Sequence, residues 1–158
     1  MEFLMMTLFA ALAAALDQGV KALVAANIPL FTRIPLIPGV LNLTQVHNYG
    51  AAFSSFQGAR WLFVLIFLVF TAAVVWEYRT KAMAFTVFER WCIAAIYGGG
   101  AGNFIDRIRH GYVVDMIETA FMDFPVFNVA DCFITCGCIA LLVHLVFFNK
   151  SFWKDGKQ

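Results

Sequence analysis

Four long apolar stretches constrain the fold of this chain most strongly. They cover residues 3–26, 61–78, 85–105 and 127–148, and a helix needs about 20 mostly apolar residues to cross a bilayer. The composition agrees, because 62% of the 158 residues are hydrophobic and only 13% are charged, which is more apolar than a typical soluble domain. We therefore predict an all-α membrane protein, a single domain over residues 1–158 with four transmembrane helices.

Charge and cysteine usage exclude several functional classes. A net charge of +1 leaves no basic excess for nucleic acid. The cysteines all fall in apolar stretches rather than in polar loops, which argues against a secreted disulfide framework and favours small packing residues. They are Cys92, Cys132, Cys136 and Cys138. Because neither C-x-x-C nor H-E-x-x-H occurs, we expect no metal and no cofactor.

Two of the apolar stretches carry further signals. Residues 3–26 contain "AALAAAL", which offers the A-x-A cleavage sites of a signal peptide, but Met1-Glu2 provides no basic n-region, so we favour a retained helix. Residues 85–105 lead into "YGGGAGN", whose small residues permit close helix approach. We expect this third helix to be packed and central.

The distribution of Lys and Arg gives the orientation. Residues on one side are Arg79, Lys81, Arg90, Lys150, Lys154 and Lys157, and those on the other are Lys21, Arg33, Arg60, Arg107 and Arg109. If Lys21 and Arg107 belong to motifs at the membrane, the first side predominates. Both termini are then cytoplasmic, and residues 27–60 and 106–126 form outer loops.

The first outer loop has β character. After three prolines it reads "VLNLTQVHNYGAAFS", with a turn signal at Asn48 and Gly50, which is typical of strands joined by tight turns. We predict a small extracytoplasmic β-rich element.

Charged residues within the apolar stretches are functional candidates, because a central Asp costs on the order of 2.5 to 3.5 kcal/mol to insert. Asp17 and Lys21 stand four positions apart, share a helix face and can neutralise one another. A structural role, in which the pair fixes the position of the helix, is sufficient to explain these two residues. Asp106, beside Arg107, is also best interpreted as structural or interfacial.

Asp115 and Asp131 lack a local counter-charge. Asp131 follows "PVFN", where Asn128 is a plausible N-cap, so Asp131 falls in the first turn of the last helix. Two carboxylates about 5 Å apart repel by roughly 3 kcal/mol, which keeps one protonated near neutral pH. Such a pair supplies a base and an acid for attack of water on an amide.

The residues alone leave three functions open. An aspartic hydrolase uses Asp115 and Asp131 as described. A proton-coupled transporter would relay protons through them, but it predicts inverted repeats with broken helices, which the sequence does not show convincingly. A non-enzymatic assembly subunit would tolerate isosteric Asn at both positions.

Four motifs in order resemble lipoprotein signal peptidase, or signal peptidase II, the bacterial membrane aspartic peptidase family. They are "LDQGVK" at 16–21, "NYGAAFS" at 48–54, "GGGAGNFIDRIRHGYVVD" at 98–115 and "FNVAD" at 127–131. The resemblance implies a substrate that is a diacylglyceryl-modified prolipoprotein, cut on the N-terminal side of its lipidated lipobox cysteine. It also implies four spans in the bacterial inner membrane, cytoplasmic termini, and an active site near the outer leaflet. We expect a monomer that contacts membrane lipids.

The resemblance also implies roles for individual residues. The catalytic dyad falls on Asp115 and Asp131. The supporting positions are Asn103, Arg107 and Asn128 as polar lining, Asn48 and Gly50 as the outer-loop motif, and Asp17 and Lys21 as the first-helix motif. One departure is Met116, where the family commonly carries Phe, which touches only packing. The resemblance assigns nothing to His47 or His144, and we expect His144 to hydrogen-bond a neighbouring helix.

Overall fold

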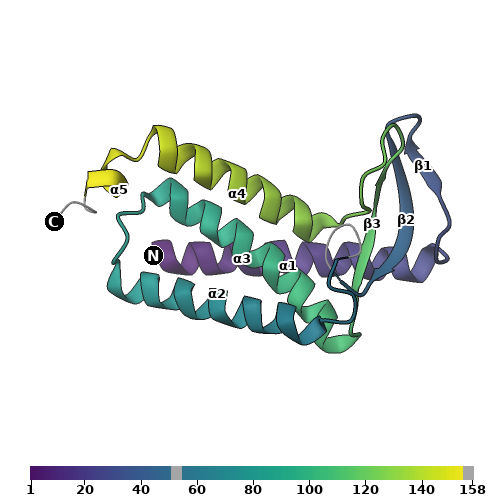
Figure 1. Ribbon diagram of the computed structural model, residues 1–158, viewed down its shortest axis with the longest axis horizontal. Coiled ribbons are helices and arrows are strands. Elements are labelled where there is room, and N and C mark those ends of the chain that lie inside the picture. The colour runs from purple at the N-terminus through teal and green to yellow at the C-terminus, as the bar shows by residue number, and fades with distance from the viewer. Residues whose placement is uncertain (51–54, 155–158) are drawn as a thin grey trace.

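The computed structural model describes residues 1–50 and 55–154. Its elements, in chain order, are α1 (Glu2–Asn27), β1 (Ile34–Ile37), β2 (Leu41–Asn48), α2 (Arg60–Thr80), α3 (Val87–Arg109), β3 (Val113–Thr119), α4 (Val129–Phe147) and the short α5 (Lys150–Lys154). The four long helices run side by side, the sheet covers one end of the bundle, and the start of α1 and the short α5 lie at the other end (Figure 1).

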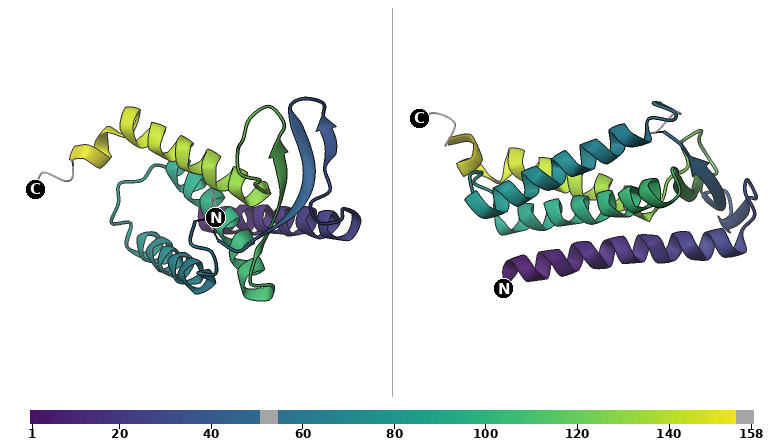
Figure 2. Two further views of the ribbon diagram at one scale, coloured as in Figure 1. Left: turned by 45° about the vertical axis from the view of Figure 1, so that its right-hand side comes forward. Right: turned by 90° about the horizontal axis from the view of Figure 1, so that it is seen from below.

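The third helix is the centre of the bundle, as predicted. α3 packs against α1, α2 and α4, and α1 and α2 lie on either side of it (Figure 2, right). Its glycines allow this close packing, because a Cβ at Gly98 would meet the backbone of Ala10 on α1 and a Cβ at Gly99 would meet the carbonyl of Ala130 on α4.

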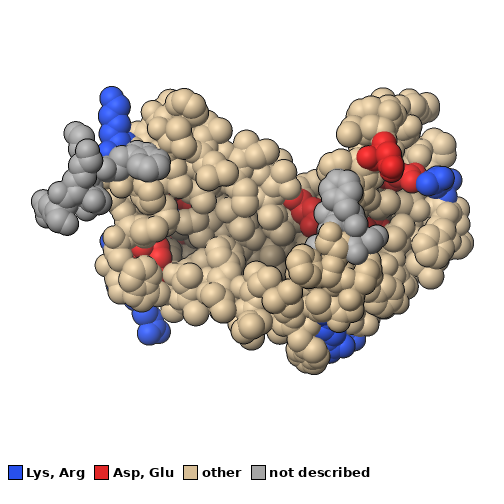
Figure 3. Space-filling view, in the orientation of Figure 1, with Lys and Arg blue, Asp and Glu red and all other residues tan. Residues whose placement is uncertain are grey.

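Three helices of the described chain are long and apolar enough to cross a membrane: α1, α2 and α4. α3 begins at Val87 and continues to Arg109, so its bounds differ from the predicted 85–105. Both of its end turns carry charged side chains, and its middle is glycine-rich, so it lacks the apolar surface of a lipid-facing helix. In Figure 3 the Lys and Arg side chains lie toward the two ends of the molecule, with a band free of them between.

The predicted β-rich element is a three-stranded antiparallel sheet in the order β1-β2-β3. Val46 of β2 pairs with Asp115 of β3, and Asn48 pairs with Val113. An irregularity in β2 between Leu43 and Val46 interrupts the ladder. This register brings Asn48, at the end of β2, beside the strand that carries Asp115.

The sheet is fixed to the bundle by a small apolar core. Val24 and Ile28, at the end of α1, pack with Val114 and Met116 of β3. Met116 is fully buried in this core, so the side chain at this position serves packing, as expected. Strand β3 therefore has a fixed position over the end of α1.

The cysteines are free, and they do not all pack inside the protein. Cys92 is buried, and its carbonyl lies against Gly137 of α4. Cys132 and Cys136 are exposed on α4, which is long and apolar enough to cross a membrane.

Candidate active site

Asp131 lies in the first turn of α4, as predicted, and Asn128 is the N-cap. The backbone N–H of Asp131 donates to Asn128 Oδ1 over 2.9 Å, and the backbone N–H of Asn128 donates to Asp131 Oδ2 over 3.1 Å. This reciprocal pair is a capping box, and the partial positive charge of a helix N-terminus favours an anion there. Local sequence therefore fixes the carboxylate of Asp131.

Asp115 comes to the same place from the sheet. Its side chain is buried, and each carboxylate oxygen accepts one hydrogen bond from an amide, from Asn48 Nδ2 at 2.9 Å and from Asn128 Nδ2 at 2.6 Å. Asn128 therefore contacts both acids, Asp115 through its side-chain NH₂ and Asp131 through the cap.

Asn103 of α3 completes the ring of amides around the two acids. Its Nδ2 donates to Asp131 Oδ1 over 2.8 Å. Its Oδ1 accepts from Asn128 Nδ2 at 3.1 Å and from Lys21 Nζ at 2.9 Å. Both oxygens of Asp131 thus accept hydrogen bonds, one from α3 and one from its own cap.

The orientation of each amide is set by a neighbour that can only donate. Gly50 N–H donates to Asn48 Oδ1, Lys21 donates to Asn103 Oδ1, and Asp131 N–H donates to Asn128 Oδ1. A backbone N–H and an ammonium have no acceptor, so all three NH₂ groups must face the carboxylates. The site presents oriented donors to both acids.

A buried cluster behind the amides consists of Asp17, Lys21 and Asp106. Lys21 Nζ lies 2.8 Å from Asp17 Oδ2 and 2.9 Å from Asp106 Oδ2, which confirms the predicted pairing of Asp17 with Lys21. With Asn103 these contacts use all three protons of the ammonium.

The two acids of this cluster hold the backbone beside Asp131 and Asp115. Asp17 Oδ1 accepts the N–H of Ala130 at 2.9 Å, and Asp106 Oδ2 accepts the N–H of Val114 at 3.1 Å. These are the residues directly before Asp131 and Asp115. We predicted a structural role for Asp106, and its carboxylate indeed holds the backbone at Val114, directly before Asp115.

Arg107 lies at the edge of the site. Its guanidinium donates to the carbonyls of Gly50 at 3.0 Å and Asn103 at 3.3 Å, and it stacks over Phe63 of α2 at 4.4 Å from the ring centroid. It thus connects the outer loop to the bundle. The remainder of the "NYGAAFS" motif, residues 51–54, lies outside the described residues.

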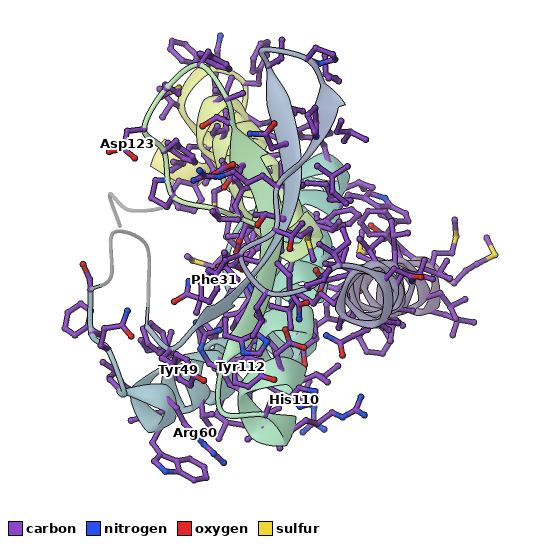
Figure 4. All side chains as sticks on the ribbon, turned by 90° about the vertical axis from the view of Figure 1, so that its right-hand side faces the viewer. Phe31, Tyr49, Arg60, His110, Tyr112 and Asp123 are labelled. Carbon is purple, nitrogen blue, oxygen red and sulfur yellow. The ribbon has the colours of Figure 1, made fainter. Side chains whose placement is uncertain are left out.

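Aromatic rings support the strand that carries Asn48. His47 stacks on Tyr112 with ring centroids 3.8 Å apart, and Tyr49 and His110 also contact Tyr112. Tyr49, His110 and Tyr112 lie together below the sheet in Figure 4. Burial, together with the nearby His110, lowers the pKa of His47. We therefore interpret His47 as a neutral packing group.

The two acids have different surroundings. Burial raises the pKa of Asp115 from 3.8 to about 7; the charge of Asp131 adds to this, while hydrogen bonds from Asn48 and Asn128 oppose it. Asp131 is only partly buried. Asp115 is thus suited to hold a proton at neutral pH, and Asp131 is the more accessible of the two acids.

All nine residues predicted from the sequence meet at this end of the bundle, but two contributors were missed. Gln18 of α1 donates to Asp106 Oδ1 over 2.8 Å and to the carbonyl of Gly102 over 3.1 Å. A polar residue beside Asp17 in an apolar helix is a signal that identifies it. Phe63 gave no signal, since it is one of 18 Phe residues.

Elsewhere, His144 contacts Glu89 of α3 at 2.8 Å, as expected for a bond between helices.

The arrangement can carry out hydrolysis. A protonated carboxyl beside a carboxylate supplies a general acid and a general base. Acidic side chains are visible in a hollow between the bundle and the sheet (Figure 3). No cluster of metal-ligating side chains occurs within residues 1–50 and 55–154. Fold and site together define a membrane-embedded aspartic peptidase.

Comparisons with known proteins agree with this class. Residues 9–147 match the family model described as signal peptidase (SPase) II. A lipoprotein signal peptidase of Streptococcus pyogenes serotype M2 is 40% identical over 89% of this chain and 88% of its own, and one of Streptococcus thermophilus is 43% identical over 89% and 86%. A solved structure described as a bacterial membrane enzyme is 32% identical, with a TM-score of 0.85 over 93% of this chain and 90% of that one.

The chain belongs to the signal peptidase II family. It is accordingly a membrane aspartic endopeptidase.

Proposed function

We propose that this enzyme removes the signal peptide from diacylglyceryl-modified prolipoproteins, cutting on the N-terminal side of the lipidated lipobox cysteine with water activated by Asp115 and Asp131. Family membership supports the prolipoprotein substrate. The observation that carries the mechanism is the contact of Asn128 with both acids, which differ in burial.

In the proposed reaction Asp131 is the base and Asp115 the acid. Asp131 takes a proton from water as the water oxygen bonds to the scissile carbonyl carbon, and Asp115 gives its proton to the carbonyl oxygen. The resulting gem-diol collapses when Asp131 returns its proton to the leaving nitrogen, the C–N bond breaks, and Asp115 recovers a proton from a diol hydroxyl. Both acids end as they began.

The supporting residues act by orientation. Asn103 and Asn128 hold the two carboxylates in place. Arg107, partly buried at the edge of the site, is placed to hydrogen-bond the substrate backbone beside the dyad. Asn48 and Gly50 connect Asp115 to the outer loop. Asp17 and Lys21 position the dyad from behind.

The membrane setting follows from the same proposal. α3 crosses as a fourth span in the bacterial inner membrane, both termini are cytoplasmic, and the dyad lies near the outer leaflet. A substrate held by its own acyl chains gains about 0.8 kcal/mol per buried methylene from the membrane. It can therefore reach the dyad by lateral diffusion, and one copy of the chain is sufficient for catalysis.

The test compares wild type with Asp115→Asn and Asp131→Asn, using a diacylglyceryl-modified prolipoprotein in detergent or lipid vesicles. Asn keeps the shape of Asp and cannot carry the proton. Asp123→Asn is the matched control, because Asp123 is an exposed acid away from the site (Figure 4). The same prolipoprotein without its lipid is the second substrate.

We expect wild type and the Asp123 variant to release the signal peptide from the lipidated substrate only. Both dyad variants should fold, as judged by their thermal transitions, and should be inactive. Cleavage that survives in either variant removes that residue from the mechanism. A wild type that leaves the lipidated substrate intact overturns the function.

A further inference from the structure

A cavity lies in the bundle, away from Asp115 and Asp131. α1 and α2 both pack on α3, and between them is a cavity of about 570 Å³. Small side chains line its wall, among them Ala11 and Ala14 of α1 and Ala73 of α2. The side of the bundle that carries α1 and α2 faces the reader in Figure 2, right.

This cavity is separate from the active site. α3 turns Ala94, Tyr97 and Ala101 toward it, whereas Asn103 and Arg107 point to the dyad and its edge. None of the residues around the two catalytic acids lines the cavity. Whatever binds here does not occupy the place of the scissile bond.

The cavity is elongated along α1. It runs along α1 from Phe3 to Ala14, which is roughly 17 Å at 1.5 Å per residue. A hydrocarbon chain fits this space, and in a membrane acyl chains are the surrounding solvent.

Polar groups are concentrated at one end of the cavity, at Glu77 and Arg90. Glu77 Oε2 accepts the backbone N–H of Met83 at 2.9 Å. Glu77 Oε1 is buried and forms an ion pair with Arg90 Nη2 at 3.9 Å, but it accepts no hydrogen bond from the described residues. An unmet buried acceptor on a carboxylate is costly, so this oxygen is suited to an external donor.

The depth of these groups matches lipid headgroups. Trp76, next to Glu77, is exposed near the end of α2, where indole rings settle at a membrane interface. This is the end of the bundle where the start of α1 and the short α5 lie, opposite the sheet (Figure 1). A carboxylate acceptor and a guanidinium side by side complement an ammonium and a phosphate.

We propose that this cavity binds a membrane phospholipid whose headgroup carries both a primary ammonium and a phosphate. The ammonium donates to Glu77 Oε1, the phosphate contacts Arg90, and one acyl chain lies between α1 and α2. Burying a chain already in lipid yields little hydrophobic gain, so selectivity comes from the headgroup. The proposal does not depend on the peptidase reaction.

The test is native mass spectrometry of the purified full-length protein in detergent. Phosphatidylethanolamine and phosphatidylglycerol with identical acyl chains are titrated separately, and one-to-one adducts are counted. We expect the ethanolamine lipid to bind at least about tenfold more tightly. Equal binding of the two lipids overturns the proposal.

Two variants locate the site. Glu77→Gln keeps an acceptor for Met83 N–H and turns a donor toward the ammonium, so the preference for ethanolamine should disappear. Ala73→Phe fills the cavity and should weaken binding of both lipids at least tenfold, whereas Ala72→Phe, exposed and outside the cavity, should not. A preference that persists in Glu77→Gln, or adducts undiminished in Ala73→Phe, places the lipid elsewhere and overturns the proposal.

Discussion

The side-chain amide of Asn128 donates to Asp115 Oδ1 over 2.6 Å, and the residue that donates is also the N-cap of the helix that carries Asp131. One side chain therefore sets the position of both acids. Asn128 is fully buried, so neither hydrogen bond can be replaced by bulk solvent. Capping and catalysis depend on the same amide, and variants can separate the two roles.

Asn128→Ser should retain most of the cap and lose the contact with Asp115, because Ser is as good an N-cap as Asn but has no NH₂ group. Leaving a buried carboxyl oxygen without its donor costs about 1 to 3 kcal/mol of stability. We expect kcat to fall roughly 10- to 100-fold. The measurements are thermal unfolding and cleavage of a lipidated prolipoprotein.

Asn149→Ser is the matched control. Asn149 is also buried and donates from Nδ2 to a carboxylate, Glu89 Oε2, at 2.7 Å, but at the end of the bundle that carries the start of α1 and the short α5. It should lose comparable stability and keep kcat. If both variants lower kcat equally, Asn128 acts through global stability and not through the dyad.

The pH dependence of activity should reflect Asp115. Its pKa is raised to about 7, mainly by burial, and the proposed acid must be protonated. Cleavage should therefore decline tenfold per pH unit well above pH 7. A pH profile of kcat/KM in detergent measures this, and an unchanged rate up to pH 9 excludes Asp115 as the acid.

Stability should depend on the same group, with a sign that follows from linkage. Since the folded pKa of about 7 exceeds the reference value of 3.8, the folded state retains a proton that the unfolded state has lost. Unfolding free energy should fall as pH rises from about 4 to about 7, by at most roughly 4 kcal/mol. Asp115→Asn should lack this fall; a fall of the same size in the variant contradicts the assignment.

Part of this site could be predicted from the sequence because its signals are local. The spacing of Asp17 and Lys21, and the position of Asn128 three residues before Asp131, are set by helix geometry. Apolar length likewise predicted α1, α2 and α4 as spans. The first two inferences need only neighbours within about one helical turn, and the third needs only a continuous run of about 20 apolar residues.

The remaining contacts join distant residues, and no local pattern encodes them. Lys21 meets Asn103 across two helices, and Asn48 meets Asp115 only because of the register between β2 and β3. The family resemblance placed these residues in one site, but which atom donates and which accepts depends on tertiary packing.

Lys21→Met should destabilise the protein strongly. The ammonium is buried between Asp17 and Asp106, and removing it leaves two uncompensated buried carboxylates, for which about 3 to 5 kcal/mol is typical. Cleavage should also fall, since Asn103 loses the donor that fixes its amide. Thermal unfolding and the prolipoprotein assay measure the two effects.

The double variant Lys21→Met with Asp17→Asn separates charge from orientation. The Asp17→Asn change keeps an acceptor for the N–H of Ala130 and removes one of the unpaired charges, so part of the stability should return. Activity should not return, because nothing then orients Asn103. Recovery of both would show that Lys21 serves stability alone.

Gly99→Ala should damage the site from a distance. An added Cβ would meet the carbonyl of Ala130 and the side chain of Ile134, so the start of α4, which carries Asp131, must move away from α3. Small displacements of a catalytic group cost up to about 100-fold in rate, and overpacking costs about 1 to 3 kcal/mol.

The control is Gly19→Ala, in the interior of α1 with nothing within 4 Å of its Cβ, which should gain up to about 1 kcal/mol from helix propensity. We expect thermal unfolding to move in opposite directions for the two variants, and only Gly99→Ala to lose cleavage. Equal behaviour of the two would mean that the packing of α3 on α4 does not hold Asp131 in place.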